Sequence, residues 1–269
     1  MTKYFIFSAT ICMTFFLLSC SPESPKNSDS ENIKEQVDSQ TEEKIATAII
    51  NSAIQKAGLD QLGQSFVEFD FRDKHYSYLK TGGKYKYERS FTDKEGKQIK
   101  DELNNTGFNR WTDGDSTVLE DKKARAYAYS VNSVIYFAFL PYSLNDPAVI
   151  SEHLGKVDIN GKSYNKIKVT FKEEGGGDDF EDTFIYWFNT ETYNMDYLAY
   201  EYHTDGGGMR FREAFNPRKI NGVLIQDYKN YKPKTKGSIS IENIDKAFES
   251  DELELLSEIV LENVQVELN

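Results

Sequence analysis

The sequence predicts an α+β fold whose centre is a large antiparallel sheet. Strand-like runs outnumber helical ones along the 269 residues, and no regular alternation of strand and helix appears. Two hairpin dipeptides, Asn160-Gly161 and Asn221-Gly222, bracket much of the second half of the chain. Because both central residues of the favoured two-residue turn need a positive φ, these dipeptides predict tight turns in an antiparallel meander.

The first half of the folded region is predicted to hold one helix and several short strands. Apolar residues recur every three or four positions from Glu43 to Ala57, and Gly58 supplies a stop, which predicts a helix. Strand-like runs follow at Ser65–Arg72, His75–Lys80, Lys84–Phe91, Phe108–Trp111 and Ser116–Leu119.

A second helix is predicted in the middle of the chain, from Glu120 to Leu140. Tyr127, Val131 and Ile135 fall on one helical face, and Pro141 ends the segment. The second half of this helix, VIYFAFL, is apolar all round, so it is buried on most sides or faces an apolar cavity. The meander then supplies strands near Tyr164–Lys172, Phe180–Phe188, Met195–His203 and Met209–Phe215, a helix at Ile241–Ser250 and a last strand at Ser257–Glu267.

Residues 1–19, MTKYFIFSATICMTFFLLS, have the form of a secretory signal peptide. Lys3 precedes an apolar run from Tyr4 to Leu18, which is shorter than the roughly 20 residues that a membrane-spanning helix needs. The run leads into Leu17-Leu18-Ser19-Cys20, which resembles the bacterial lipobox, where the cysteine is acylated and the chain is cut before it. An ordinary cleaved signal beside a chance cysteine is the alternative.

The cysteine count favours lipidation at Cys20. The chain has two cysteines, and Cys12 lies inside the apolar run that cleavage removes. The mature chain therefore keeps Cys20 alone, which cannot form an internal disulfide. As a lipid acceptor it would anchor the protein to a membrane.

Residues 20–43 are predicted to be a lipidated, disordered tether, and residues 44–269 a single domain. Apart from Ile33 and Val37 the tether has no sizeable apolar side chain, so it cannot repay the entropy of ordering. The formal net charge is −12, and it becomes −13 once cleavage removes residues 1–19, which include Lys3. An acidic domain repels phosphate backbones, so we expect no nucleic-acid partner.

Two glycine-rich segments, residues 175–184 and 206–215, share the pattern GGGxxFx[DE]xF. In a meander their loops are two turns apart and should fall on the same rim of the sheet. The first segment carries acidic residues, and the second carries Arg210 and Arg212. These segments are either two hairpin loops with balanced surface charge or a polar mouth to a site lined by aromatic residues.

No catalytic or metal-binding signature stands out. The three histidines are scattered, the acidic loop 173–182 lacks EF-hand spacing, and neither GxSxG nor a phosphate-binding GK[ST] occurs. We therefore expect no metal, no cofactor and no enzymatic activity. The alternative is an envelope hydrolase that uses carboxylates at the triple-glycine rim, around Asp178, Asp179 and Asp182.

Aromatic residues are abundant, with 17 Tyr and 18 Phe, and they occur on both faces of the predicted strands, which implies that both faces are at least partly covered. One account is a core on one side and helices on the other. The second is a curved sheet whose concave side holds a partly open apolar pocket beneath the segment 134–140. In the second account the lid residues are Tyr136, Phe137, Phe139 and Leu140, and the wall residues are Tyr200, Tyr202, Phe211 and Phe215.

Several longer stretches resemble a family of uncharacterised predicted lipoproteins from Gram-negative envelopes, across nearly all of residues 60–269. They are SVNSVIYFAFLPYSLNDPAV, HLGKVDINGKSYNKIKVTF, EEGGGDDFEDTFIYWFNTETY, DYLAYEYHTDGGGMRFREAF and NYKPK. Some members carry the label deoxyribose-phosphate aldolase, an activity of a (β/α)₈ barrel that a strand-rich meander contradicts. The order of elements is also similar to the LolA/LolB lipoprotein-carrier fold, an unclosed half-barrel with helices over its concave side.

These patterns and resemblances lead to one working hypothesis. The protein would be a non-enzymatic, membrane-anchored envelope lipoprotein that binds a lipid, a lipoprotein acyl chain or another apolar or amphipathic ligand in a half-barrel concavity. We expect a monomer held at the outer membrane, facing the periplasm or the exterior. A structural or surface-interaction lipoprotein is the remaining reading.

Overall fold

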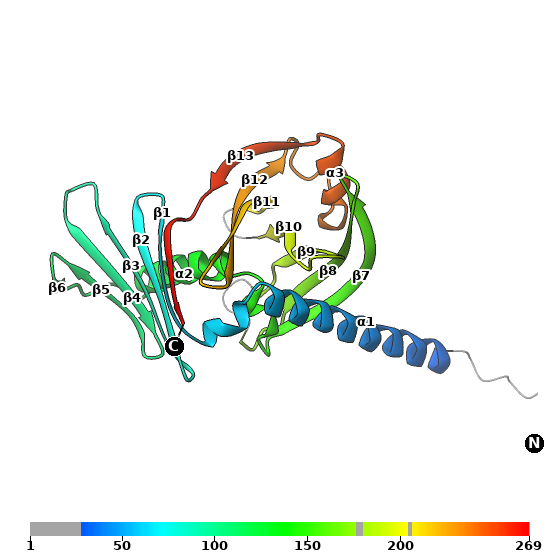
Figure 1. Cartoon of the computed structure of the whole chain (residues 1–269), viewed down its shortest axis with the longest axis horizontal. Helices are drawn as coiled ribbons and strands as arrows, with labels where there is room; N and C mark the ends of the chain where they lie inside the picture. The colour runs from blue at the N-terminus through cyan, green and yellow to red at the C-terminus, as the bar shows by residue number, and fades with distance from the viewer. Residues whose placement is uncertain (1–27, 176–179, 204–205, 269) are drawn as a thin grey trace, which may run out of the picture. The chain divides into compact units, whose positions relative to one another are not determined.

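The computed structural model describes residues 28–175, 180–203 and 206–268, with side chains described from residue 39 onward (Figure 1). The chain divides into two compact units, Met1–Val37 and Asp38–Asn269, and the second unit holds both sheets. The helical elements are α1 (Ser28–Lys56), η1 (Leu59–Gly63), α2 (Asp121–Ala138), η2 (Tyr142–Asn145), η4 (Ile241–Asn243) and α3 (Ile244–Glu249).

The first sheet has seven antiparallel strands in the order β14-β1-β2-β3-β4-β5-β6. Apart from β14, it is a simple meander of neighbouring hairpins. Its strands are β1 (Gln64–Phe71), β2 (Lys74–Thr81), β3 (Lys84–Thr92), β4 (Gln98–Asn104), β5 (Gly107–Thr112), β6 (Asp115–Ser116) and β14 (Glu262–Leu268).

The second sheet also has seven antiparallel strands, in the order β13-β12-β11-β10-β9-β8-β7. It follows the sequence without a crossover and curves on the side of α2 away from β5 and β6 (Figure 1). Its strands are β7 (Val149–Ile159), β8 (Lys162–Phe171), β9 (Thr183–Asn189), β10 (Met195–Tyr202), β11 (Gly208–Ile220), β12 (Val223–Pro233) and β13 (Leu253–Ile259).

The chain passes from the second sheet back to the first at residues 260–261. β13 pairs with β12, whereas β14 pairs with β1. The backbone amide of Leu261 donates to Asp227 Oδ1 at 3.0 Å, and Arg218 donates to the Leu261 carbonyl. Arg218 also pairs with Asp227 at 3.0 Å. These polar contacts hold the segment between β13, in the second sheet, and β14, in the first sheet.

The structure confirms an α+β fold with large antiparallel sheets that do not close into a barrel. The strands form two sheets rather than the single sheet predicted, because α2 separates β6 from β7 along the chain. Both predicted hairpin turns are present. Asn160 and Gly161 have φ of 50° and 74°, and Asn221 and Gly222 have φ of 47° and 88°.

The first helix begins at Ser28, whereas the sequence predicted a helix from Glu43 and a disordered tether before it. Residues 28–43 contain many Glu, Gln and Lys residues, whose unbranched side chains favour a helix without supplying an apolar stripe. The structure describes residues 28–43 as the first part of α1. No helix in the described part of the chain is long and apolar enough to cross a membrane.

Two hydrophobic cores lie on opposite faces of the second sheet. The inner core lies between the sheets and is filled by α1 and α2, with Ile54, Ile135 and Tyr186 among its buried members. The outer core lies beneath η4 and α3, with Trp187 and Ile244 fully buried. The prediction that both faces of the meander are covered is therefore confirmed.

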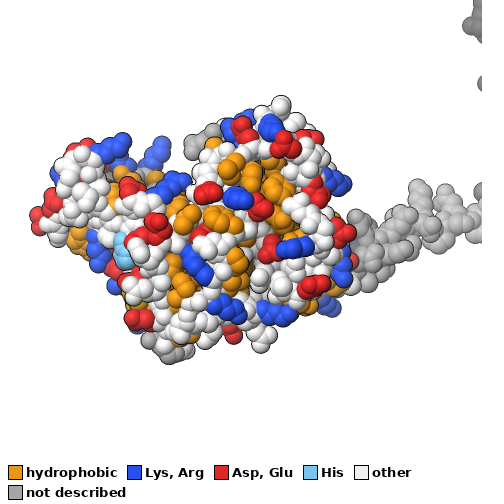
Figure 2. All heavy atoms as spheres, turned by 45° about the horizontal axis from the view of Figure 1, so that its top comes forward, with side chains coloured by type: hydrophobic (Ala, Val, Ile, Leu, Met, Phe, Trp, Pro, Cys, Tyr) orange, Lys and Arg blue, Asp and Glu red, His pale blue; other side chains and the backbone are white. Residues whose placement is uncertain are grey.

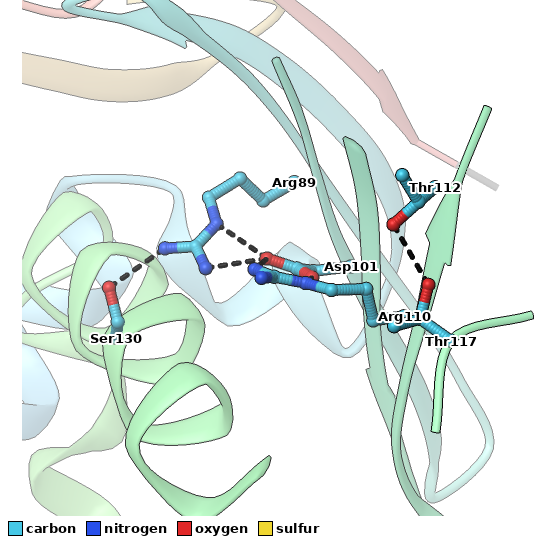
Figure 3. Close-up of polar contacts among 6 residues, drawn as sticks. All are labelled: Arg89, Asp101, Arg110, Thr112, Thr117 and Ser130. Atoms are coloured by element: carbon cyan, nitrogen blue, oxygen red, sulfur yellow. Dashed lines mark hydrogen bonds and ion pairs between the residues drawn. The ribbon is translucent and has the colours of Figure 1, made fainter. Parts of the chain in front are cut away.

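A buried polar cluster fastens α2 to the first sheet (Figure 3). Asp101 on β4 is fully buried and accepts hydrogen bonds from Arg89 on β3 and Arg110 on β5. Arg89 extends from this cluster to Ser130 on α2, with Nη1 2.8 Å from the hydroxyl oxygen. The Arg110 guanidinium lies 3.7 Å from the ring centroid of Tyr127, also on α2. Charged groups of the sheet therefore set the position of this helix.

Candidate functional site

A cavity of about 510 Å³, here called the main cavity, lies between α2 and the two sheets. Its size falls within the range of roughly 300–1,000 Å³ that is usual for small-molecule sites. Aromatic side chains dominate the lining: Tyr78, Tyr87, Tyr129, Tyr136, Phe137, Phe139, Tyr142, Phe171, Phe184, Tyr200 and Tyr202. The cavity therefore presents large, stiff apolar surfaces from both sheets and from the helix.

The aromatic rings of the main cavity contact one another in continuous rows. Phe137 on α2 lies 5.4 Å from Tyr200 on β10, and Phe184 on β9 lies 5.6 Å from Tyr200, both measured between ring centroids. On the first sheet, Tyr78 and Tyr87 stack at 5.3 Å. Such ring contacts add to the stability of packing and hold the walls in defined positions.

Few charged groups line the main cavity: Lys80, Asp146, Asp182 and Arg210. Desolvation raises the pKa of the Asp146 carboxyl above its ordinary value, and the charge of Lys80 opposes that shift. Asp182 is buried, with 7% of its surface exposed. The described residues include no group of three or more His, Cys, Asp or Glu that could hold a metal ion.

The described parts of the two triple-glycine segments lie at the same edge of the second sheet. Thr183 at the start of β9 and Met209 near the start of β11 both pair with Glu201 on β10. Gly175 and Arg210, which come from the two segments, line the main cavity together. Polar residues from both segments, Asp182 and Arg210, therefore line the aromatic cavity at one edge of the second sheet.

Two buried tyrosine hydroxyls lie behind the helix. Burial raises the pKa of Tyr136 to about 12 and raises the pKa of Tyr186 well above its ordinary value. Each hydroxyl therefore keeps its proton at neutral pH. The two hydroxyls also interact with each other, which lowers the pKa of Tyr136 and raises that of Tyr186. Because Tyr136 lines the main cavity, its O–H can serve a polar group of a bound ligand.

A smaller cavity of about 300 Å³, here called the side cavity, adjoins the main cavity. Ser133, Phe137 and Tyr200 line both. The side cavity is otherwise bounded by residues of β11, β12 and the crossing between the sheets, including Arg212, Tyr228 and Leu261. The two cavities are therefore separated by little more than one aromatic pair.

Three of the four predicted lid residues line a cavity. Tyr136, Phe137 and Phe139 line the main cavity, from α2 and the residue that ends it. Leu140 is buried in the inner core and lines neither cavity. Whether these residues bind a ligand remains a proposal.

Two of the four predicted wall residues line a cavity. Tyr200 and Tyr202 line the main cavity, but Phe211 is fully buried in the outer core on the opposite face of the sheet. The pairing register shows why: Phe211 lies opposite Ala199, and Arg212 lies opposite Leu198. Phe215 shares the face of Phe211 and lines neither cavity. Side-chain alternation in β11 therefore turns Arg210 and Arg212, and not Phe211 and Phe215, toward the cavities.

Other predicted sites cannot be placed. Cys20, Asp178 and Asp179 lie outside the described residues. Asp182, the third residue of the predicted hydrolase site, lines the main cavity. The carboxylate pair that motivated the hydrolase alternative is therefore untested.

Sequence reasoning missed the contribution of the first sheet. Tyr78 and Tyr87 supply one wall of the main cavity. Their alternation with polar residues in HYSYLK and KYKYERS was visible in the sequence, but it does not reveal that the first sheet faces the meander across α2.

Figure 2 shows how apolar surface reaches solvent on one face of the molecule. Hydrophobic side chains gather near the middle of this face and over part of the second sheet, among scattered Lys, Arg, Asp and Glu side chains. This face is therefore mixed rather than uniformly acidic, although the formal net charge of the chain is −12.

Comparison with solved structures gives distant likenesses. A DUF1329 family protein from Desulfovibrio piger is 12% identical, with 82% of this chain and 92% of that one covered, at a TM-score of 0.49. A LolA superfamily protein from Nitrosomonas europaea is 10% identical, covering 81% and 91%, at 0.44. The Mycobacterium tuberculosis lipoprotein LppX is 11% identical, covering 61% and 91%, at 0.28. Likenesses this remote carry no information about the ligand.

Sequence comparison gives the family but no activity. No curated protein matches the chain. A family model described as a family of unknown function, DUF6503, matches residues 6–261, which include every described helix and every described strand except β14. The predicted membership of an uncharacterised family is confirmed, and the chain belongs to the DUF6503 family.

Proposed function

We propose that this protein binds an apolar or amphipathic ligand, such as a lipid or a lipoprotein acyl chain, in the main cavity. The observation that carries the proposal is the cavity itself, about 510 Å³ of space with eleven aromatic side chains in its lining, contributed by α2, η2 and strands of both sheets. A void of this size costs stability unless something fills it, because its lining loses packing contacts. A flexible apolar chain would restore those contacts.

The surroundings of the cavity suit binding rather than catalysis. Its wall helix α2 is held to the first sheet by Arg89 and Ser130, 2.8 Å apart, so the apolar lining is pre-formed. The Tyr136 hydroxyl offers a hydrogen-bond donor beside the rings. We infer a holding or receiving role in which the ligand is kept out of water.

The proposal includes a location in the cell envelope. The signal-like residues 1–19 and the lipobox-like Leu17–Cys20 support a lipid anchor at Cys20, at the outer membrane. Residues between Cys20 and the sheets would then set the reach of the binding unit from the membrane. An anchored protein of this kind would hold or receive its ligand rather than carry it freely.

Filling the cavity should weaken binding. We expect native mass spectrometry of the chain from Ser21 to Asn269, which retains the whole unit Asp38–Asn269, to find a co-purified lipid. Ser133 on α2 lines both cavities, so Ser133→Phe should lower lipid occupancy by about tenfold or more.

The matched control is Ser116→Phe, at an exposed position on β6, which should leave occupancy unchanged. Thermal unfolding of both variants reports whether they stay folded. If the wild-type protein binds no lipid and takes up none from vesicles, the proposed function is wrong.

Replacing Cys20 should release the protein from the membrane. In cells fed a labelled fatty acid, the wild-type chain should incorporate the label, and Cys20→Ser should incorporate none because serine lacks the acceptor thiol. Because acyl burial contributes about 0.8 kcal/mol per CH₂, its loss should move the variant out of the membrane fraction. Cys12→Ser is the control, and equal labelling of both variants would contradict the assignment of Cys20.

A further inference from the structure

We propose that the side cavity holds the acidic head of a single-chain anionic amphiphile, with the Arg212 guanidinium as its partner. The inference rests on the proposed function, and it adds the chemical class of the ligand and the place of its head. It starts from one buried charge for which the described residues supply no counter-ion.

Arg212 is the exception among the buried cations. In the described chain three cationic side chains are less than a tenth exposed: Arg89 at 5%, Lys166 at 5% and Arg212 at 8%. Arg89 pairs with Asp101, and Lys166 pairs with Asp245. Arg212 forms no ion pair with any described residue, and its Nε is buried without a hydrogen-bond partner. A buried charge without a partner is costly, so this arrangement calls for an anion.

The contacts that Arg212 does make leave room for such an anion. Its Nη2 donates to the Tyr200 hydroxyl at 3.2 Å, and its guanidinium carbon lies 4.1 Å from the ring centroid of Phe137. These contacts orient the planar group and offset part of its desolvation. They supply no negative charge, and they leave Nε free to donate.

The lining of the side cavity is complementary to an anionic head that carries an apolar chain. It includes Arg72 and Arg212, and no Asp or Glu. Burial raises the pKa of Tyr228 above its ordinary value, so this lining residue remains a hydroxyl donor. The apolar part of the lining is Phe71, Val134, Phe137, Ala138, Ile259 and Leu261.

The wall that the two cavities share indicates the direction in which the ligand's hydrocarbon chain would run. Phe137 and Tyr200 line both cavities, and both contact Arg212. A head bound at Arg212 would therefore pass its first carbons over this aromatic pair into the main cavity. Carboxylate and phosphate monoester heads share the required chemistry, since each offers paired oxygens to a guanidinium.

The test compares three ligands that differ only in the head. Dodecanoate, dodecyl phosphate and dodecanol are titrated into the chain from Ser21 to Asn269, below the concentrations at which they aggregate. A charge-assisted hydrogen bond contributes enough for about 10- to 100-fold in affinity, so at least one anion should bind that much more tightly than dodecanol. The stronger anion identifies the head as carboxylate or phosphate.

Variants assign the preference to Arg212. Arg212→Gln should bring the anion within about threefold of dodecanol while dodecanol itself binds nearly as before, and Arg212→Lys should keep part of the preference. The control is Arg125→Gln, an exposed position on the same helix as Phe137, which should keep the full preference. An unchanged preference in Arg212→Gln would overturn the assignment.

A measurement on the wild-type protein covers the case in which Arg212→Gln does not fold. Carbon-13 NMR of carboxyl-labelled dodecanoate should show the bound head staying ionised to lower pH than the free acid, because the guanidinium stabilises the carboxylate. Titration as in free solution, or equal affinity of all three ligands, refutes the anionic head but leaves the proposed function standing. Failure of every ligand to bind refutes both.

Discussion

Replacement of Asp101 by asparagine is expected to lower the free energy of unfolding by about 3–5 kcal/mol, the range for removing one partner of a buried ion pair. Asp101 is fully buried and is the shared acceptor of two guanidinium groups. Arg110 Nε lies 2.6 Å from its Oδ1, and Arg89 Nε lies 3.0 Å from its Oδ2 (Figure 3). Asparagine leaves both cations without a negative charge and turns an amide N–H₂ toward donors.

The measurement is chemical denaturation of the wild type and the variant, with Asp73→Asn as the matched control. Asp73 pairs with Lys74 on the surface, with 72% of its side chain exposed, and such pairs contribute about 0–1 kcal/mol. Asp101→Asn should also weaken the attachment of α2 to the first sheet, because Arg89 joins Asp101 to Ser130. A loss below about 1 kcal/mol for Asp101→Asn would show that the cluster is not a stabilising tie.

Replacement of Asp245 by asparagine is expected to lower the free energy of unfolding by about 3 kcal/mol or more. Asp245 on α3 is 3% exposed, and its Oδ2 lies 2.8 Å from Lys166 Nζ and 3.2 Å from Trp187 Nε1. The change leaves the buried Lys166 ammonium without a negatively charged partner. Its remaining acceptor is the Glu242 carbonyl oxygen, at 2.6 Å.

Asp251→Asn is the control, because Asp251 pairs with Lys234 while 91% of its side chain is exposed. The double change Lys166→Met with Asp245→Leu should recover most of the loss, since apolar groups can replace a buried pair with little net cost. The fluorescence of Trp187 should shift to longer wavelength in Asp245→Asn alone. A double variant as unstable as the single one would contradict the charge argument.

Sequence patterns predicted the local elements well where one physical signal dominated. The hairpins at Asn160-Gly161 and Asn221-Gly222 followed from backbone conformations that few other residue pairs adopt. The central helix followed from its apolar period, and the structure has it as Asp121–Ala138. The signal is weaker in β4, Gln98–Asn104, which the sequence prediction omitted. Its inward positions include Asp101, so the strand does not alternate in hydrophobicity.

The candidate site was harder to predict because β11 is ambiguous. Arg210 and Arg212 alternate with Phe211, and both faces of the second sheet are covered. Burial alone would favour the phenylalanine for the cavity, whereas the register with β10 places Arg212 there. The sequence of β11 does not show which of its faces will be covered by which element. The outer face of the second sheet is covered by η4 and α3, which lie about 30 residues further along the chain. Only tertiary structure supplies that information.

The crossing of the chain at residues 260–261 also governs when the molecule can be completed. β1 near the start of the folded unit has β14 as its outer neighbour, with Ser65 opposite Leu268 and Phe66 opposite Glu267. Until the last residues have been synthesised, that edge of β1 has no strand to pair with, and exposed edges invite aggregation. A product cut short before Glu262 would leave that edge of β1 open.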